Sequence, residues 1–269
     1  MVKFACVSCT HAPITHEGYW KWVLGILQDF KPEVFIHLGD LYEGKPAKKW
    51  PKHLDETWTM MDEHNAVADQ IEQINELVPG QKVWLYGNHD DNVFGLSPDR
   101  IPEDIRSAIR WEHQKRNSVA LDGWKVLPYS HRALHRLGQI TFQHGCEANV
   151  SAEKNSAYLY GVPYGLYIQG HTHRPIAITQ CEERQTPLPY HYANPGCGAD
   201  WEKMHYMQRC KMGKWGRGMI IGEVSESSVK NRKSTYSSKQ WDAELLLHSW
   251  ASDTKYTVGS VAQKYGIAA

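Results

Sequence analysis

Short apolar runs alternate with amphipathic helices in the first third of the chain, and this alternation limits the possible folds more than any other feature. Residues 2–8, 34–38 and 82–86 are apolar runs typical of buried strands. Between them, apolar residues recur at helical spacing over residues 19–30 and 54–78, and each of these patterns ends at a proline. This order predicts parallel strands joined by helical crossovers, and therefore an α/β fold.

The regular alternation stops after the third strand. The expected later elements are a helix at 102–114, strands at 139–143 and 166–169, a second β-layer over 176–221, a short amphipathic helix at 241–250 and a further helix at 257–265. The chain therefore divides into a main domain at 1–228 with an insert at 91–136, a linker at 229–239 and a C-terminal helical segment at 240–269.

Composition excludes several classes of protein. With 269 residues, 41% of them hydrophobic and 22% charged, the chain is neither disordered nor collagen-like. Thirty basic residues balance thirty acidic ones, so overall charge gives no affinity for nucleic acid or membranes. No apolar run approaches the ~20 residues of a membrane helix, and the N-terminus does not resemble a signal peptide. The six cysteines form no CxxC pair, so we expect reduced thiols and a cytoplasmic location, without membrane contact.

Metal-competent side chains follow the predicted strands. These segments are Cys9-Thr10-His11, Gly39-Asp40, Gly87-Asn88-His89-Asp90, His144-Gly145 and Gly170-His171-Thr172-His173. Each of them alone could be an ordinary polar turn. Together, and in this order after strands, they indicate one site, because the carboxyl ends of strands in an open α/β sheet converge on a single crevice. The chain's 15 histidines are consistent with this interpretation, since histidine is the commonest metal ligand.

The residue types suit two metal ions held by nitrogen and oxygen ligands. A carboxylate such as Asp40 has two oxygens and can bridge a pair of cations. The remaining positions can be filled by imidazoles and by one amide oxygen, from His11, His144, His171, His173 and Asn88. Two cations about 3.5–4 Å apart can stabilise both the attacking and the leaving oxygen of a phosphoryl transfer.

These motifs resemble those of the calcineurin-like metallophosphoesterases, whose pattern is D-x-H, G-D, G-N-H-[DE], H and G-H-x-H. The resemblance covers roughly Lys3 to Val224, and Asn194-Pro195-Gly196 is similar to the family's closing strand. It implies a four-layer αββα sandwich with two divalent ions, Mn²⁺, Zn²⁺ or Fe²⁺. It also implies a phosphate ester as substrate.

The resemblance also implies a role for each residue. His11, Asp40 and His173 would hold one metal ion, and the other would be held by Asp40 as the bridge with Asn88, His144 and His171. His89 would be the acid that protonates the leaving oxygen, oriented by Asp40 or by a neighbouring carboxylate.

Cys9 departs from the family pattern, because it stands where the first motif has aspartate. A thiolate ligand favours Zn²⁺ or Fe²⁺ over Mg²⁺ or Mn²⁺, and it makes a site sensitive to oxidation. The RNA lariat debranching enzymes, a nuclease branch of the same superfamily, carry the same exchange. The alternative is a thiol that does not bind metal.

Two further segments bear on the substrate. The insert mixes basic and aromatic side chains that could bind phosphates and stack on bases, or could form an ordinary helix with a solvated face: Arg106, Arg110, Trp111, His113, Lys115, Arg116 and Trp124. The tail at 258–267 resembles the start of a DNA-binding helix-turn-helix, or a helix docked on the main domain.

The leading prediction from the sequence is a two-metal hydrolase of phosphate esters, either a phosphodiesterase or a nuclease. A phosphomonoesterase is the alternative. A non-catalytic scaffold of the same fold should have lost several ligands, whereas only the position of Cys9 departs. A purely structural zinc site needs four ligands, fewer than this chain offers. The sequence leaves the oligomeric state open.

Overall fold

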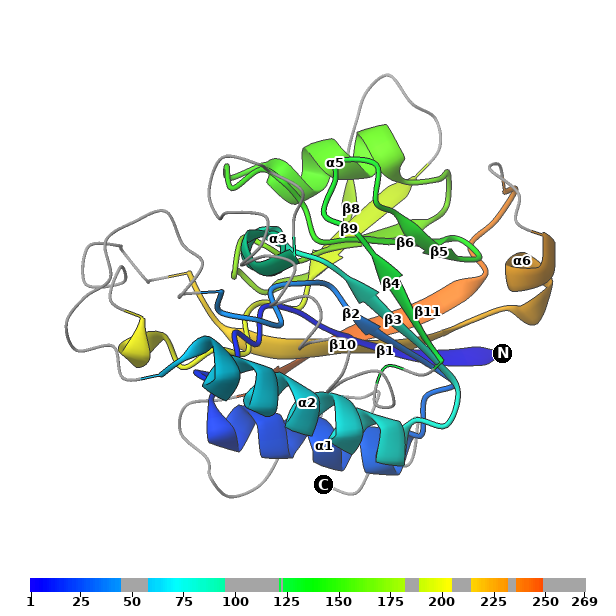
Figure 1. Ribbon diagram of the computed structural model, residues 1–269. Coiled ribbons are helices and arrows are strands. Elements are labelled where there is room, and N and C mark those ends of the chain that lie inside the picture. The colour runs from blue at the N-terminus through cyan, green and yellow to red at the C-terminus, as the bar shows by residue number, and fades with distance from the viewer. Residues whose placement is uncertain are drawn as a thin grey trace.

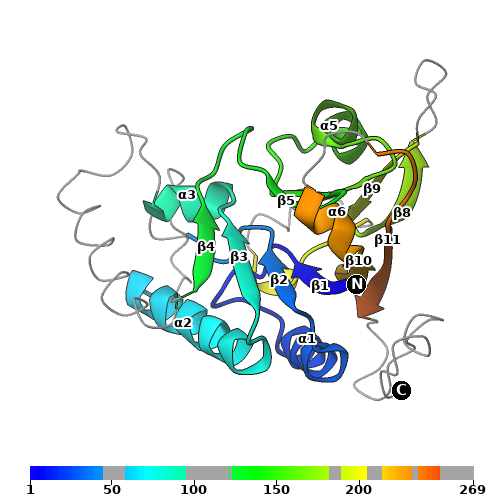
Figure 2. The same ribbon diagram turned by 90° about the vertical axis from the view of Figure 1, so that its right-hand side faces the viewer.

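Two β-sheets stack face to face, with helices on both outer faces (Figure 1). The computed structural model describes residues 1–44, 58–94, 121, 123–181, 189–204, 214–231 and 236–248. Helices α1 and α2 cover the outer face of the first sheet, and α5 covers that of the second (Figures 1 and 2). The four-layer αββα sandwich is therefore confirmed.

The first sheet has the strand order β11-β10-β1-β2-β3-β4. Its strands are β1 (Val2–Val7), β2 (Val34–His37), β3 (Gln81–Leu85), β4 (Trp124–Leu127), β10 (Arg217–Val224) and β11 (Trp241–His248). Strands β1 to β4 pair in parallel, and β10 and β11 are antiparallel. The parallel strands expected from the alternation are confirmed.

The second sheet has the order β5-β6-β7-β9-β8. Its strands are β5 (His135–Leu137), β6 (Ile140–Gln143), β7 (Leu166–Gln169), β8 (Ile176–Cys181) and β9 (Tyr190–Asn194). Strands β6, β7 and β9 are parallel neighbours. A second β-layer was expected over residues 176–221, but β10 from that stretch joins the first sheet instead.

The described helices are α1 (Glu17–Phe30), α2 (Met60–Leu77), α3 (Asn88–Phe94), α5 (Ala152–Tyr160), α6 (Glu226–Asn231) and the 3₁₀ turn η2 (Trp201–Lys203). Helix α2 begins at a capping box in which Thr59 and Asp62 satisfy each other's backbone N–H groups. Among the described residues, no helix is long and apolar enough to cross a membrane.

Alternate residues of β1 serve the two faces of the first sheet. Phe4 and Cys6 pack between the sheets, in a cluster with Phe142 of β6 and other apolar side chains. Ala5 and Val7 face the other way, into the cluster formed with α1 and α2. Because both faces are covered, the central strands are mainly apolar on both faces, as is typical of parallel strands.

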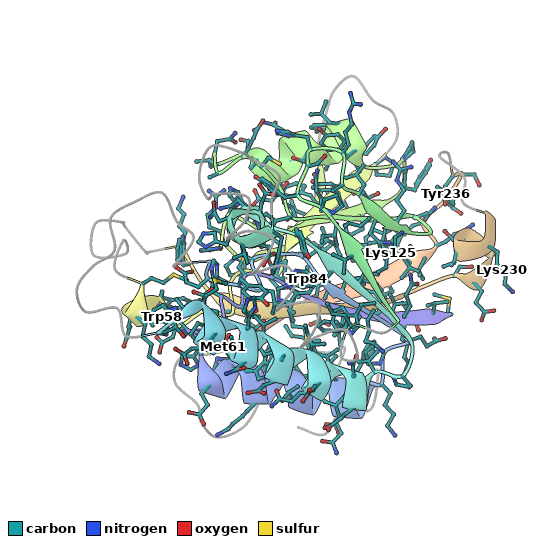
Figure 3. The ribbon with its side chains drawn as sticks, viewed as in Figure 1. Trp58, Met61, Trp84, Lys125, Lys230 and Tyr236 are labelled. Carbon is teal, nitrogen blue, oxygen red and sulfur yellow. The ribbon has the colours of Figure 1, made fainter. Side chains whose placement is uncertain are left out.

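A third cluster lies beside these two, around the fully buried Trp84 of β3. The indole of Trp84 stacks on Tyr42, with 6.0 Å between ring centroids. Figure 3 shows Trp84 within the molecule, whereas Lys230 projects from α6 at its edge.

The C-terminal part departs from the prediction. The helix expected at 241–250 is wrong over its described part, because Trp241–His248 is strand β11, paired with β10 along its whole length. The predicted linker at 229–239 begins inside α6. The helices expected at 102–114 and 257–265 and the tail at 258–267 lie outside the described residues, as do the named basic and aromatic residues of the insert except Trp124, which begins β4.

Candidate metal centre

The predicted site residues come together where the strands end. Cys9 and His11 follow β1, Asp40 follows β2, and Asn88 and His89 open α3 directly after β3. From the second sheet, His144 follows β6, while His171 and His173 follow β7. Two of the groups whose ligand atoms lie within 4.8 Å of one another contain these residues: Cys9, His11, Asp40 and His173 in one, and Asp40, His144 and His171 in the other. Asp40 belongs to both groups.

Five of these residues adopt the left-handed backbone conformation, which side chains other than glycine rarely occupy. Their φ angles are 54° for Cys9, 51° for His11, 52° for Asp40, 65° for His171 and 61° for His173. Such a residue costs about 1–3 kcal/mol and persists only where the surrounding structure holds it. Strain concentrated on so many neighbouring polar residues is typical of a functional site.

The first group is deeply buried. The Nε2 atoms of His11 and His173 lie 3.3 Å apart, and His11 Nε2 lies 4.0 Å from Asp40 Oδ2. Cys9 and His11 are fully buried, and His173 is 5% exposed. Two ring nitrogens and a carboxylate oxygen that face one another at these distances form a donor set for a cation.

The second group surrounds His144 Nε2. This nitrogen lies 3.3 Å from Asp40 Oδ2, 3.3 Å from Asn88 Oδ1 and 3.2 Å from His171 Nδ1. Asn88 thus supplies an amide oxygen beside the three metal-competent side chains. Carboxylate, amide and imidazole donors together suit divalent ions such as Mn²⁺, Zn²⁺ or Fe²⁺.

Hydrogen bonds on the far side of two rings direct their lone pairs into the cluster. His144 Nδ1 donates to the carbonyl of Leu38 at 2.7 Å, and His11 Nδ1 donates to Glu43 Oε2 at 2.9 Å. In the neutral rings, Nε2 of each histidine is therefore an unprotonated acceptor that faces Asp40. This arrangement, with Nδ1 donating to an oxygen and Nε2 directed at the site, is usual for metal-binding histidines.

Burial disfavours the protonated form of three of the histidines, whereas the Asp40 carboxylate stays charged. Burial lowers the pKa of His11 and of His173, and it lowers that of His171 to about 4. Burial opposes ionisation of Asp40, but the nearby imidazoles of His144, His89 and His11 outweigh it and hold the Asp40 pKa well below 3.8.

The Cys9 thiol behaves differently. Burial first, then the charge of Asp40, raises the pKa of Cys9 well above 9.0, so without a cation this residue is a neutral thiol.

Two acidic residues that the sequence analysis gave no role of their own organise the centre. Glu43 is 4% exposed and contacts both His11 and His89. Asp90 accepts hydrogen bonds from the backbone N–H groups of Asp40, Tyr42 and Gly87, at 2.8 to 2.9 Å. Asp90 thereby ties the loop after β2 to the loop after β3. The sequence did hold a signal for each residue. Asp90 belongs to the Gly-Asn-His-Asp motif, and Glu43 follows Asp40 by three residues.

Comparison with known proteins names the family. The family model of the calcineurin-like phosphoesterases matches residues 2–175. This chain belongs to that family. All of the metal-competent side chains described above lie within the matched residues.

Curated relatives of this calcineurin-like phosphoesterase include the Gene 54 proteins of Mycobacterium phages D29 and L5. Each is 25% identical over 181 residues, which is 64% of this chain and 69% of the relative. Similar solved structures include Yfce, a phosphoesterase from E. coli, which is 15% identical in sequence. The match covers 83% of this chain and 93% of that chain, with a TM-score of 0.40. Vps29 of Chaetomium thermophilum has 10% identity, 83% and 82% coverage, and a TM-score of 0.41.

Close packing of the loops explains two glycines of this phosphoesterase. A Cβ atom at Gly87 would lie 2.1 Å from Asp40 Oδ1, and one at Gly39 would lie 2.5 Å from the backbone nitrogen of Gly87. Gly39 also has a φ of +100°. A side chain at Gly87 would displace the Asp40 carboxylate, and one at Gly39 would push against Gly87 and the His144 ring.

A buried network holds the loop that carries His171 and His173. Asn194 donates to the Gly170 carbonyl at 3.0 Å and to Glu153 Oε1 at 3.0 Å. Thr172, which stands between the two histidines, also donates to Glu153. Glu153 lies on α5 and is 1% exposed, so it anchors this loop to the outer helix of the second sheet.

An open pocket of about 630 Å³ lies over the cluster. The lining of this pocket includes Asp40, Asn88, His89, His171 and His173. The rest of its wall includes Ala148, Val150, Arg174, Lys214 and Trp215. The pocket thus combines metal-competent residues with cationic and apolar side chains.

Proposed function

We propose that this calcineurin-like phosphoesterase hydrolyses phosphate esters at a two-cation site and that phosphodiesters are its preferred class. The observation that carries the proposal is the pair of donor groups that share Asp40 and lie against the pocket. A single structural ion would not need two such groups.

The donor sets assign the residues to two cations. Cys9, His11, Asp40 and His173 would hold one cation, and Asp40, Asn88, His144 and His171 the other. When bound, two divalent cations polarise a phosphoryl oxygen and lower the pKa of water to near neutrality. A thiolate from Cys9 would favour Zn²⁺ or Fe²⁺ over harder ions.

The position of His89 supports a role in protonating the leaving oxygen. Its Nδ1 donates to the Glu43 carbonyl oxygen at 2.7 Å, and its side chain is 14% exposed and lines the pocket. With Nδ1 engaged, the other ring nitrogen is the atom that transfers the proton. The Glu43 carboxylate also lies 3.4 Å from Nδ1. Glu43 is thus the neighbouring carboxylate that could orient His89, while Asp40 Oδ1 accepts a bond from the His89 backbone N–H at 2.8 Å.

Two observations support a diester. A pocket of about 630 Å³ has room for a substituent on each side of a phosphoryl group. The basic and aromatic insert at 91–136 also lies in sequence between two of the site motifs, and such residues bind nucleic acid phosphates and bases. Nuclease activity is therefore the form of diesterase activity to test first.

The test compares bis-p-nitrophenyl phosphate with p-nitrophenyl phosphate, beside a panel of single- and double-stranded nucleic acids. We expect hydrolysis of the diester to exceed that of the monoester with added Mn²⁺, Zn²⁺ or Fe²⁺, to disappear with a chelator and to return on metal add-back. Full activity in metal-free protein would contradict the two-cation proposal. A strong preference for the monoester would instead identify a phosphomonoesterase.

A further inference from the structure

The part of the pocket wall formed by Ala148, Val150, Arg174, Lys214 and Trp215 is not accounted for by hydrolysis alone. We propose that this wall binds a nucleotide, with the base stacked on Trp215 and the phosphate charge next to Arg174 and Lys214. The inference deepens the proposed function, because it names the substrate class of the same site. Its observations are the placement of these side chains and what holds them there.

Trp215 is a fixed aromatic surface. Its ring stands edge-on to that of His173, with 4.2 Å between centroids and 80° between planes. It packs against the buried cluster that contains Cys9, Ile14 and Trp201, and the rest of its surface lines the pocket. An indole that is already held in place stacks on a planar ligand without losing much side-chain entropy. Any base can stack on an aromatic side chain, because every base has a π-face.

Arg174 is a positioned cation. Its Nη2 donates to the Asn149 carbonyl oxygen at 2.7 Å and lies 3.7 Å from Glu153 Oε2. The side chain is 16% exposed. A guanidinium carries five N–H donors, and these two contacts occupy only part of them. The remaining donors can bind a phosphate oxygen at the pocket wall.

Lys214 adds a second, solvent-exposed cation beside Trp215. The chain as a whole has no net charge, so these two cations are a local feature of the pocket. A phosphate with one planar ring attached matches a wall with one fixed aromatic ring and two cations. The exposed Val150, 78% accessible, provides a further apolar contact at the same wall.

The test measures binding, so that its result does not depend on turnover. Titration calorimetry with the Mn²⁺-loaded protein would compare AMP, ribose 5-phosphate and adenosine. AMP and ribose 5-phosphate share the sugar and phosphate, and adenosine lacks the phosphate. We expect AMP to bind about 5- to 150-fold more tightly than ribose 5-phosphate, the range that stacking on one aromatic ring provides.

Variants separate the two halves of the wall. Trp215→Leu should weaken AMP and adenosine but leave ribose 5-phosphate unchanged, and Trp215→Phe should retain most of the preference for AMP. Lys214→Met should weaken AMP and ribose 5-phosphate together, without affecting adenosine. Lys230→Met is the matched control, because Lys230 is an exposed lysine on α6 outside the pocket, and it should change none of the three (Figure 3).

Metal content measured in each variant shows whether a loss of affinity comes from a lost cation, since Trp215 contacts His173. Equal affinities for AMP and ribose 5-phosphate in the wild type would overturn the inference. A base preference that survives Trp215→Leu would also overturn it. Either result would leave the proposed hydrolysis intact, because hydrolysis is measured separately with bis-p-nitrophenyl phosphate.

Discussion

The buried carboxylate of Glu43 contacts two histidines to which we assign different tasks. It accepts a hydrogen bond from His11 Nδ1 at 2.9 Å and lies 3.4 Å from His89 Nδ1. The sequence identified both histidines from their motifs, whereas the signal for Glu43 is only its position three residues after Asp40. The role of Glu43 depends on contacts with His11 and His89, which are 32 and 46 residues away in sequence, and no local pattern encodes those contacts.

Replacing His89 tests the assignment of proton transfer. In His89→Ala, kcat for bis-p-nitrophenyl phosphate should fall by about 10²–10⁴-fold, the usual contribution of a general acid. Metal content should stay close to that of the wild type, because His89 belongs to neither of the two groups that share Asp40. Elemental analysis of the purified variant provides the check. Loss of the cations would show that His89 is a metal ligand instead.

Cys9 tests the departure from the family pattern. If its thiolate binds metal, Cys9→Asp should shift the metal preference toward Mn²⁺ or Mg²⁺, because carboxylates favour harder ions. Cys9→Ser should weaken the first cation, because a hydroxyl is neutral, while the His144 and His171 group keeps the second. Metal content and metal-dependent rates are measured for the three proteins, with and without peroxide. Identical behaviour in all three would make Cys9 a bystander.

At the scale of elements, strand β11 shows where pattern reading fails. Leu245, Leu246 and Leu247 in succession suit a helix as well as a strand. Pairing with β10 over eight residues decides between them, and it directs Leu245 and Leu246 to different clusters. Such pairing is a tertiary effect that outweighs local preference. The strands with parallel neighbours on both sides were predictable, because their residues are apolar on both faces.

Strand β5 provides a prediction about stability. His135 is 5% exposed, packs beside Phe142 with 6.0 Å between ring centroids, and has no hydrogen-bond partner for either ring nitrogen among the described residues. Burial, with the nearby charge of Lys125, lowers the His135 pKa from 6.5 to about 4. Between these pH values His135 binds a proton in the unfolded chain but not in the folded one. The folded state therefore loses stability relative to the unfolded state as the pH falls from about 6.5 toward 4.

The corresponding variant is His135→Phe. Protonation of His135 in the unfolded chain should lower the unfolding free energy of the wild type by about 2 kcal/mol between pH 7 and pH 5. The variant should lack this contribution. Urea titrations of both proteins at the two pH values measure the difference. An equal pH dependence in the two proteins would mean that His135 is protonated, or accessible to water, in the fold.

At the scale of the whole molecule, the candidate centre lies where strands of both sheets end. Cys9, His11, Asp40 and Asn88 follow strands of the first sheet, and His144, His171 and His173 follow strands of the second. Convergence of strand ends could be predicted from motif order, because parallel strands direct their carboxyl ends to one edge. The sharing of Asp40 and the left-handed backbone could not, because both depend on how the sheets are stacked.

A site that spans both sheets should stabilise the fold when it is filled. With free metal at about 100 times its dissociation constant, the native state gains about 2.7 kcal/mol. For a chain of this size that raises Tm by about 5–10 °C. Scanning calorimetry with and without Mn²⁺ or Zn²⁺ measures the shift. His135→Phe, a buried histidine outside the cluster, should keep it, whereas His144→Ala should reduce it. An equal shift in both variants would place the stabilising ion elsewhere.

The positive φ angles at Cys9, His11, Asp40, His171 and His173 have a consequence for sequence change. Glycine relaxes this conformation, so any other residue substituted at these positions keeps a strain of about 1–3 kcal/mol. Only a substitution to glycine would release this strain, and each such substitution would also remove a donor side chain of the candidate centre.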